Sequence, residues 1–507
     1  MDIIKQWFNK ISERGLVWHF FIFVITGFLL KLVYLFASPI WRVDLFFYIQ
    51  GAKTMLDGGV LFKNFVEIKP PGIFFIYYWL SILFGYSNIL VSIKFLALLS
   101  QSLTALFISA TASRVYTKKA GFAAGMAFLL AASVCYSFWP PNIMLIALTP
   151  LLASVWFCFI YIQKTVPGYL FFAGLFMGIS SAISTNLILF TLIVPVLCII
   201  NDRSIKRFIV GCLTAFAGFL VVWLSMAVYF YLNNALIDWL WWNFRWASIY
   251  GGTRPVYLRI FNFFWGMMRS WQILPLYALS FYSLYIITIK KLYRKHRDYL
   301  VLGVLFVVSL LSRLAFGKSE PRYYLYMVPF MVLLLPLAIE YFKKPQLKKI
   351  SYIFLSFVII SLSYTSFEGI SKPYRRFVTR KALHDAIKEF SDPSDKIFVW
   401  SEGYEVYLMS ERSMAGSFFS PAQHLANGYI WMRNDFRNID VPWQKFMSEF
   451  ETDQPELIVD LTGKFKGAGE EYYERPLLDY MNSFIKEVNE NYYVVSEVGR
   501  AVIWKKR

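Results

Sequence analysis

Long apolar runs separated by short polar stretches occupy the first two thirds of the chain. Many of these runs reach the ~20 apolar residues that a helix needs to cross a bilayer. They predict an α-helical polytopic membrane protein with about 11 to 12 transmembrane helices. The predicted crossings are residues 16–37, 88–112, 120–138, 143–162, 168–182, 187–200, 208–231, 270–289, 299–316, 324–342 and 350–366.

One apolar run, residues 72–85, is shorter than the others. As a helix it would reach only ~21 Å, less than the ~30 Å hydrocarbon core of a bilayer. If this run crossed the membrane fully, each later loop rich in lysine and arginine would lie on the opposite side from the one that its charge predicts. We therefore interpret the run as a partial or re-entrant helix, and whether it crosses stays open.

The pattern changes at about residue 368, where the chain becomes polar and charged. Short apolar runs there are typical of strands, and two longer segments have a helical pattern. The strand-like runs are Ile397–Trp400, Leu457–Val459, Tyr492–Val495 and Ala501–Trp504, and the helical segments are Lys381–Phe390 and Pro476–Val488. We predict a transmembrane domain over residues 1–367 and a small α/β domain over 368–507.

The charges indicate an orientation in the membrane. The chain is 58% hydrophobic and only 16% charged, with a net charge of +19. Lysine and arginine cluster in four short loops, a pattern that marks the cytoplasmic side. These loops contain Arg114, Lys118 and Lys119; Arg203, Lys206 and Arg207; Lys290, Lys291, Arg294, Lys295 and Arg297; and Lys343, Lys344, Lys348 and Lys349. We expect a cell inner (plasma) membrane protein with a cytoplasmic N-terminus and an extracytoplasmic C-terminal domain.

Other features of the composition exclude some classes of protein. The positive charge lies in membrane loops and forms no stripe on a soluble module, so we expect no nucleic-acid partner. The four cysteines, Cys135, Cys158, Cys198 and Cys212, lie in apolar runs without CxxC spacing. We interpret them as small buried hydrophobes rather than metal ligands or disulfides.

Two predicted outside loops are long, residues 38–71 and 232–269. The second is rich in Trp and Tyr, which favour the headgroup level of a membrane. Both are expected to lie partly on the membrane surface as amphipathic helices.

The first of these loops carries the most informative polar residues. Asp44 follows the first crossing and begins a helical stretch. It suits a helix N-cap, and it also suits a base that takes a proton from an acceptor at the membrane surface. Lys69 precedes two prolines. It can extend its ammonium to the interface, or hold a phosphate from a stiff mount.

A third cluster lies in a short outside loop at Gly317–Lys318 and Arg322–Tyr323–Tyr324. Arginine binds phosphate through paired hydrogen bonds, and tyrosine adds more. An aromatic anchor at the membrane interface is the alternative. Arg245, Arg254 and Arg259 add further outside cations, against the usual charge bias.

Taken in order, these residues resemble the GT-C glycosyltransferases. Within this class they resemble the bacterial relatives of dolichyl-phosphate-mannose protein mannosyltransferases, including aminoarabinose transferases (glycosyltransferase family 39-like). The resemblance covers the whole chain. It rests on Asp44, Tyr48, Ala52, Gly59, Lys69–Pro70–Pro71–Gly72, Phe84–Gly85, Gly174–Ser184, Asn234–Ala235–Leu236, Asn243, Tyr250, Arg322–Tyr323–Tyr324, Val399–Trp400 and Tyr407.

This resemblance implies a GT-C fold and transfer of a sugar from a polyprenyl-phosphate carrier to an extracytoplasmic lipid, glycan or protein acceptor. Asp44 matches the presumed catalytic base, and the transfer inverts the anomeric carbon. The implied substrate-binding residues are Lys69, Arg322, Tyr323, Tyr48, Glu67 and Arg254.

Three departures from the family pattern bear on whether the protein binds a divalent metal ion. Leu45 stands where many relatives have a second acidic residue, and Asn142 is followed by Ile143 rather than Glu. The lysine that many relatives have near Ser184 is missing. Because fewer carboxylates remain, we assign no metal, and a divalent cation stays an open alternative.

Two other functions remain as alternatives. A transporter or flippase of a lipid-linked sugar usually shows internal repeats and ionisable groups at mid-membrane, and neither is evident. A catalytically silent membrane scaffold, whose outside tail binds a partner, is the second.

Overall fold

The computed structural model describes residues 11–37, 43–134, 142–201, 204–246, 255–342, 357–367, 371, 380–400, 403, 405–419, 425, 440–463 and 477–507. The chain forms two compact units, each assembled from separate segments. The first unit consists of Met1–Ile40, Leu90–Ala227 and Thr253–Lys372, and the second of Trp41–Ile89, Val228–Gly252 and Pro373–Arg507. The predicted domain boundary at residue 367 stays a prediction.

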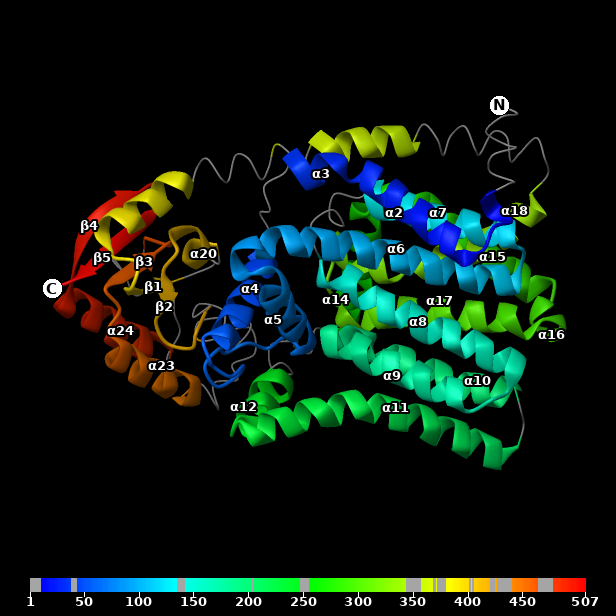
Figure 1. The fold of residues 1–507 in the computed structure, drawn as a ribbon, viewed down its shortest axis with the longest axis horizontal. Coiled ribbons are helices and arrows are strands. Elements are labelled where there is room, and N and C mark those ends of the chain that lie inside the picture. Colours follow the sequence, from blue (N-terminus) through cyan, green and yellow to red (C-terminus); the bar gives the residue numbers. More distant parts are fainter. Residues whose placement is uncertain are drawn as a thin grey trace. The chain divides into compact units, whose positions relative to one another are not determined.

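The first unit is helical (Figure 1). Its elements, two of which extend into the second unit, are α2 (Leu16–Leu30), α3 (Leu32–Ala37), α6 (Ile89–Val115), α7 (Lys118–Val134), α8 (Ile143–Lys164), α9 (Gly168–Ile183), η3 (Thr185–Leu192), α10 (Ile193–Asn201), α11 (Ile205–Leu232), α14 (Val256–Arg269), η5 (Trp271–Ile273), α15 (Leu274–Ile289), α16 (Leu292–Lys295), α17 (Arg297–Phe316), η6 (Pro321–Tyr326), α18 (Val328–Tyr341) and Phe357–Phe367.

Length and apolar composition make this a multi-pass membrane protein. Among the described residues, five helical segments are long and apolar enough to cross a bilayer, and six further apolar helices are shorter. The five are Tyr86–Val115, Ile143–Lys164, Ile205–Leu232, Trp271–Ile289 and Arg297–Ala315. The predicted fold class is confirmed.

Several predicted crossings are not single continuous α-helices. The run 16–37 is interrupted at Lys31, which separates α2 from α3. The run 187–200 starts as the 3-10 helix η3, and the run 324–342 starts within the 3-10 helix η6. Tight 3-10 turns are common at helix ends, and Pro321 fixes the first backbone angle of η6. Cys135 lies outside the described residues.

Two helices of the first unit approach at backbone distance because each contributes a glycine. A Cβ atom on Gly174 of α9 would lie 1.8 Å from the carbonyl oxygen of Ala215 in α11. A Cβ atom on Gly218 of α11 would lie 2.0 Å from the carbonyl oxygen of Phe171 in α9. Small residues at helix interfaces permit this spacing in membranes.

The second unit contains both a short helical assembly and the C-terminal sheet. Its helices outside the tail are α4 (Val43–Leu56), α5 (Gly72–Phe84), η1 (Tyr86–Asn88), α12 (Leu236–Leu240) and the π-helix η4 (Trp241–Trp246). Aromatic rings join α4 to α5, since Phe74 packs 5.4 Å from Tyr48, centroid to centroid. The predicted helix at 72–85 is confirmed as α5. Its 13 residues reach only about 20 Å, and whether it crosses the membrane stays a prediction.

The C-terminal segment forms a mixed five-stranded sheet of order β2-β1-β3-β5-β4. The strands are β1 (Lys396–Trp400), β2 (Ser413–Met414), β3 (Leu457–Asp460), β4 (Tyr492–Val498) and β5 (Ala501–Lys506). β1 pairs in parallel with β2 and β3, and β5 pairs antiparallel with β3 and β4. A two-residue turn joins β4 to β5, and Gly499 supplies its positive φ of 64°. The predicted small α/β domain is confirmed.

Two helices cover one face of this sheet, α23 (Asp440–Asp453) and α24 (Leu477–Asn491) (Figure 1). Phe398 of β1 lies against Phe446 and Phe450 of α23 and against Phe484 of α24. The remaining helices of the tail are residues 380–390 and α20 (Val406–Ser410).

Candidate functional site

Asp44 lies in the first turn of α4, and its side chain is half-buried. The helix begins at Val43, so Asp44 is inside the first turn, where a carboxylate is favoured by the helix dipole. Phe47 and Tyr48 follow by three and four residues and are both buried. On an α-helix these spacings place side chains on one face, so Asp44, Phe47 and Tyr48 share a face of α4.

Lys69 packs against that same face of α4. Its Nζ atom lies 3.8 Å from the ring centroid of Phe47 and 5.6 Å from that of Tyr48. Such cation–π contacts hold an ammonium group without removing its charge. The structure therefore brings Lys69 to two aromatic residues within a helical turn of Asp44, although 24 residues of chain separate the two polar residues.

Glu67 fixes the backbone that carries Lys69. Its side chain is only 1% exposed, and its Oε1 atom accepts hydrogen bonds from the amides of Ile68 (2.8 Å) and Lys69 (3.3 Å). Its Oε2 atom lies 3.7 Å from the Lys69 Nζ atom, forming an ion pair. The stiff Pro70–Pro71 pair follows at once. Lys69 is thus oriented by its neighbours before any ligand binds.

Asn243 of η4 contacts the same segment. Its Nδ2 atom donates to the carbonyl oxygen of Ile68 at 3.0 Å. Its Oδ1 atom and the Oε2 atom of Glu67 are buried, and neither accepts a hydrogen bond from the described residues. A buried acceptor without a donor is costly, so the Asn243 Oδ1 atom suits a ligand that brings hydroxyl or amine hydrogens, whereas the Glu67 Oε2 atom has the Lys69 ammonium at 3.7 Å.

Residues of the C-terminal domain also hold the segment between α4 and α5, which carries Lys69. The amide of Val66 donates to the carbonyl oxygen of Ser417 at 2.8 Å. Ser417 is itself held by Glu449 of α23, which accepts from the Ser417 amide (2.8 Å) and hydroxyl (2.7 and 2.9 Å). Lys445 donates to the carbonyl oxygen of Lys63 at 2.8 Å and pairs with Glu449 at 3.5 Å.

Arg322 and Tyr323 belong to the first unit, in η6. Both are partly exposed, and the Arg322 guanidinium lies 5.2 Å from the Tyr323 ring centroid. The amide of Tyr323 donates to the carbonyl oxygen of Glu320 at 3.1 Å, which closes the first turn. Arg254 lies outside the described residues, so its predicted role stays a prediction.

Sequence reasoning did not single out Arg313, which contacts the same tyrosines. It lies in α17 and its guanidinium is 5.4 Å from the ring centroid of Tyr323 and 4.7 Å from that of Tyr324. The available signal was an arginine inside a predicted crossing, because ionisable residues within membrane spans are rare and functional.

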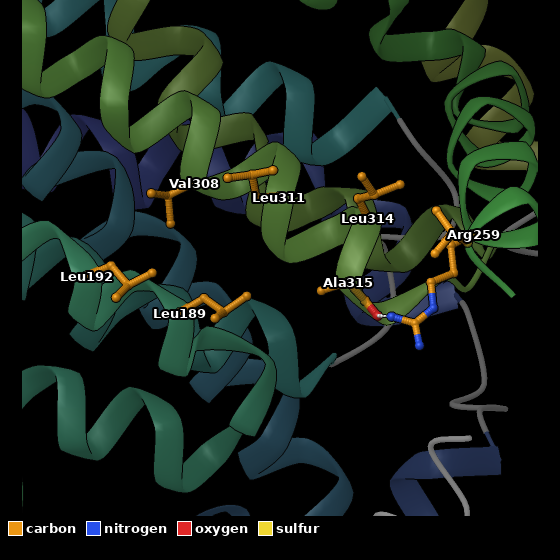
Figure 2. A pocket seen from close by; sticks show the side chains of 8 residues that line it. Leu189, Leu192, Arg259, Val308, Leu311, Leu314 and Ala315 are labelled. Atoms are coloured by element: carbon orange, nitrogen blue, oxygen red, sulfur yellow. Dashed lines mark hydrogen bonds between the residues drawn. The ribbon is translucent and has the colours of Figure 1, made fainter. Parts of the chain in front are cut away.

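An apolar cleft of about 400 Å³ opens beside α17. Figure 2 shows leucines of η3 on one wall, side chains of α17 on the other and Arg259 of α14 at one end. The Arg259 guanidinium donates to the carbonyl oxygen of Ala315 at 3.1 Å. The lining residues are Leu189, Leu192, Val256, Arg259, Val308, Leu311, Leu314 and Ala315. An apolar cleft with a cation at its end suits a lipid chain with an anionic head.

No metal site is apparent in the part of the chain that the structure describes. Within it, no group of three His, Cys, Asp or Glu side chains is arranged to hold a metal ion.

The fold resembles those of solved glycosyltransferases. ArnT from Cupriavidus metallidurans, in structures bound to undecaprenyl phosphate and in the apo state, is 13% identical to this chain with a TM-score of 0.59. The similarity covers 95% of this chain and 97% of ArnT. The archaeal oligosaccharyltransferase AglB from Archaeoglobus fulgidus, in complex with an inhibitory peptide and a dolichol-phosphate, is 11% identical with a TM-score of 0.51. That similarity covers 96% of this chain and 74% of AglB.

At this identity the similarity establishes the fold, and the expected GT-C fold is confirmed. No protein-family model matches the sequence, and no curated protein does.

Proposed function

We propose that this protein is a membrane glycosyltransferase that moves a sugar from a polyprenyl-phosphate carrier to an acceptor, with Asp44 as its base. One observation carries the proposal. Lys69 lies over Phe47, which is one turn from Asp44 on the same face of α4, so this face carries a carboxylate and is contacted by a cation. The shared fold with ArnT, which was solved with undecaprenyl phosphate, supports the carrier class.

The proposed reaction is a single displacement. Asp44 accepts a proton from the acceptor hydroxyl or amine as that nucleophile bonds to the anomeric carbon. The bond between this carbon and the phosphate oxygen breaks, and its electron pair leaves with the polyprenyl phosphate. Lys69 stabilises the negative charge that develops on this leaving group. The anomeric carbon is therefore inverted.

Other predicted residues have supporting roles in this proposal. Tyr48 packs beneath Lys69, and Glu67 orients it. Arg322, Tyr323 and Arg254 stay predicted ligands of the carrier. The positive-inside pattern supports a reaction at the extracytoplasmic face of the inner (plasma) membrane, with a lipid, glycan or protein as acceptor.

The test is the variant Asp44→Asn in the purified full-length protein, supplied with labelled polyprenyl-phosphate sugars. We expect transfer to fall by at least about 100-fold, because general-base catalysis is worth this much. Binding of the carrier should stay within about threefold, since the phosphate contacts remain. The anomeric configuration of the wild-type product, read by NMR, should be opposite to that of the donor.

The matched control is Asp57→Asn, which removes an exposed carboxylate that pairs with Lys53 near the C-terminal end of α4. It should transfer sugar like the wild type. Full activity of Asp44→Asn would remove Asp44 from the mechanism, and retention of configuration would reject single displacement. Movement of the lipid-linked sugar between leaflets without turnover would identify a transporter, and neither activity would identify a scaffold.

A further inference from the structure

Arg313 is a buried cation that forms no ion pair with any residue that the structure describes. Its side chain is 4% exposed and lies within a helix long and apolar enough to cross a bilayer. None of its three guanidinium nitrogens donates a hydrogen bond to any residue that the structure describes. A buried charge without a partner is strongly destabilising, and ionisable groups in membrane spans mark ligand sites.

Aromatic faces account for only part of the Arg313 environment. The guanidinium lies over the rings of Tyr323 and Tyr324, 5.4 and 4.7 Å from their centroids. The Tyr324 hydroxyl is already used, because it donates to the carbonyl oxygen of Phe263 at 2.5 Å. A guanidinium presents five N–H donors in its plane, and ring faces satisfy none of them.

These donors border a small polar recess. Its lining residues are Asn186, Ser309, Ser312, Arg313, Tyr323 and Tyr326. The enclosed volume is about 10 Å³, which holds roughly one water-sized oxygen atom. Three of the lining hydroxyls are already bonded, since Ser309 donates to the carbonyl oxygen of Phe306, Ser312 donates to that of Asn186, and Tyr326 bonds to Ser184. The recess therefore suits one oxygen of an anion, held mainly by Arg313.

The recess and the apolar cleft share two walls. On η3, Asn186 of the recess lies one 3-10 turn before Leu189 of the cleft, and on α17, Ser312 of the recess lies one turn after Val308 of the cleft, so the two linings adjoin on both elements. A ligand with an apolar chain and an anionic end could thus contact both along one helix. Arg259 at one end of the cleft adds a second positive charge.

We propose that Arg313 binds one phosphate oxygen of a prenyl phosphate whose chain occupies the cleft beside α17. This inference rests on the proposed function, because it assigns a site to the carrier lipid of that reaction. It adds a cation that belongs to a membrane helix rather than to the loops, and it makes the site selective for a phosphate over a neutral alcohol.

The experiment compares binding of undecaprenyl phosphate, undecaprenol and inorganic phosphate to the purified full-length protein by native mass spectrometry. The wild type should bind the phosphate lipid more tightly than the alcohol. Arg313→Met should lose about 10- to 100-fold of that affinity and leave undecaprenol binding unchanged, since a charge-assisted hydrogen bond is worth this factor. Arg207→Met removes an exposed arginine of α11 and should bind like the wild type.

A wild-type preference for the phosphate lipid in Arg313→Met would overturn the proposal. If that variant does not fold, Arg313→Lys decides. Lysine keeps the charge but lacks the planar set of donors, so a partial loss of the preference for the phosphate lipid supports the proposal. An unchanged preference overturns it. Arg313-dependent binding of inorganic phosphate without binding of the lipid would overturn the assignment of the cleft to a prenyl chain.

Binding separates this inference from the proposed function. Arg313-dependent lipid binding without any sugar transfer by the wild type would remove the glycosyltransferase proposal and keep the phosphate site. Normal sugar transfer and normal lipid binding in Arg313→Met would remove the Arg313 phosphate site and keep the glycosyltransferase proposal.

Discussion

At the residue scale, Lys69 is restrained on several sides before a ligand arrives. Its ammonium lies over Phe47, and the Glu67 carboxylate is 3.7 Å away. A free lysine side chain loses up to about 2 kcal/mol of conformational entropy when it is fixed. Because part of this cost is met on folding, a phosphate can bind Lys69 with less loss of freedom.

A second residue-scale feature is His384, in the helix over residues 380–390 of the tail. Burial, together with the positive charges of Arg380 and Lys388, lowers its pKa to about 4 against a partial opposing effect of Asp385. In an unfolded chain the pKa of histidine is about 6.5. Between these values only the unfolded state binds the proton, so stability is fully present above about pH 6.5 and falls as the pH drops.

We therefore predict that acidification from about pH 7.5 to about pH 5 lowers the stability of the C-terminal domain by about 2 kcal/mol through His384. Thermal unfolding of the full-length protein, followed by hydrogen exchange of residues 380–400, measures this. His384→Gln should reduce the pH dependence by that amount. An equal slope in the variant and the wild type would contradict the pKa of His384.

At the element scale, the segment between α4 and α5 depends on α23 of the C-terminal domain. The link runs from Val66 through the carbonyl oxygen of Ser417 to the carboxylate of Glu449. Phe419 reinforces it, because its ring packs 5.1 Å from Phe47 and 5.5 Å from Phe65. Elements about 350 residues apart in sequence thus position Lys69 together.

We predict that Glu449→Gln loosens this segment. An amide keeps only one acceptor oxygen and adds a donor, so Ser417 loses part of its support. The amides of residues 66–69 should exchange hydrogen about tenfold faster, and carrier binding should weaken several-fold. Those magnitudes follow from losing one charge-assisted hydrogen bond.

Glu451→Gln is the control, because this neighbouring carboxylate of α23 is exposed. It should change neither exchange nor binding. Unchanged exchange in Glu449→Gln would show that Ser417 is held by other contacts.

Local patterns predicted most elements, and tertiary contacts explain what they missed. The strand-like runs became β1, β3, β4 and β5 because alternation or full burial is visible in a few residues. The two-residue β2 has too short a pattern to be detected. Asp44, Tyr48, Glu67 and Lys69 were found by residue type and order. The contact of Val66 with Ser417 and the setting of Arg313 arise from packing between distant segments.

At the scale of the whole molecule, the distribution of charge decides the orientation in the membrane. We predict that the C-terminal domain is extracytoplasmic and that the first turn of α7, which contains Lys119, is cytoplasmic. In a variant without its four native cysteines, Ser483→Cys on the exposed face of α24 should react with a membrane-impermeant maleimide in intact cells. Lys119→Cys should react only after the membrane is permeabilised. The opposite pattern would invert the topology and remove the extracytoplasmic reaction.

The hydrogen bond from Val66 to Ser417 also sets an order of events during synthesis. At about 5–20 residues per second, the ribosome makes Ser417 roughly 20 to 70 seconds after Val66. The early helices can enter the bilayer during this interval, but the stretch that ends in Lys69 must wait for a partner that does not yet exist. A nascent chain stopped before Ser417 would therefore have its early helices in the membrane, but the segment that carries Lys69 would lack the hydrogen bond that holds it.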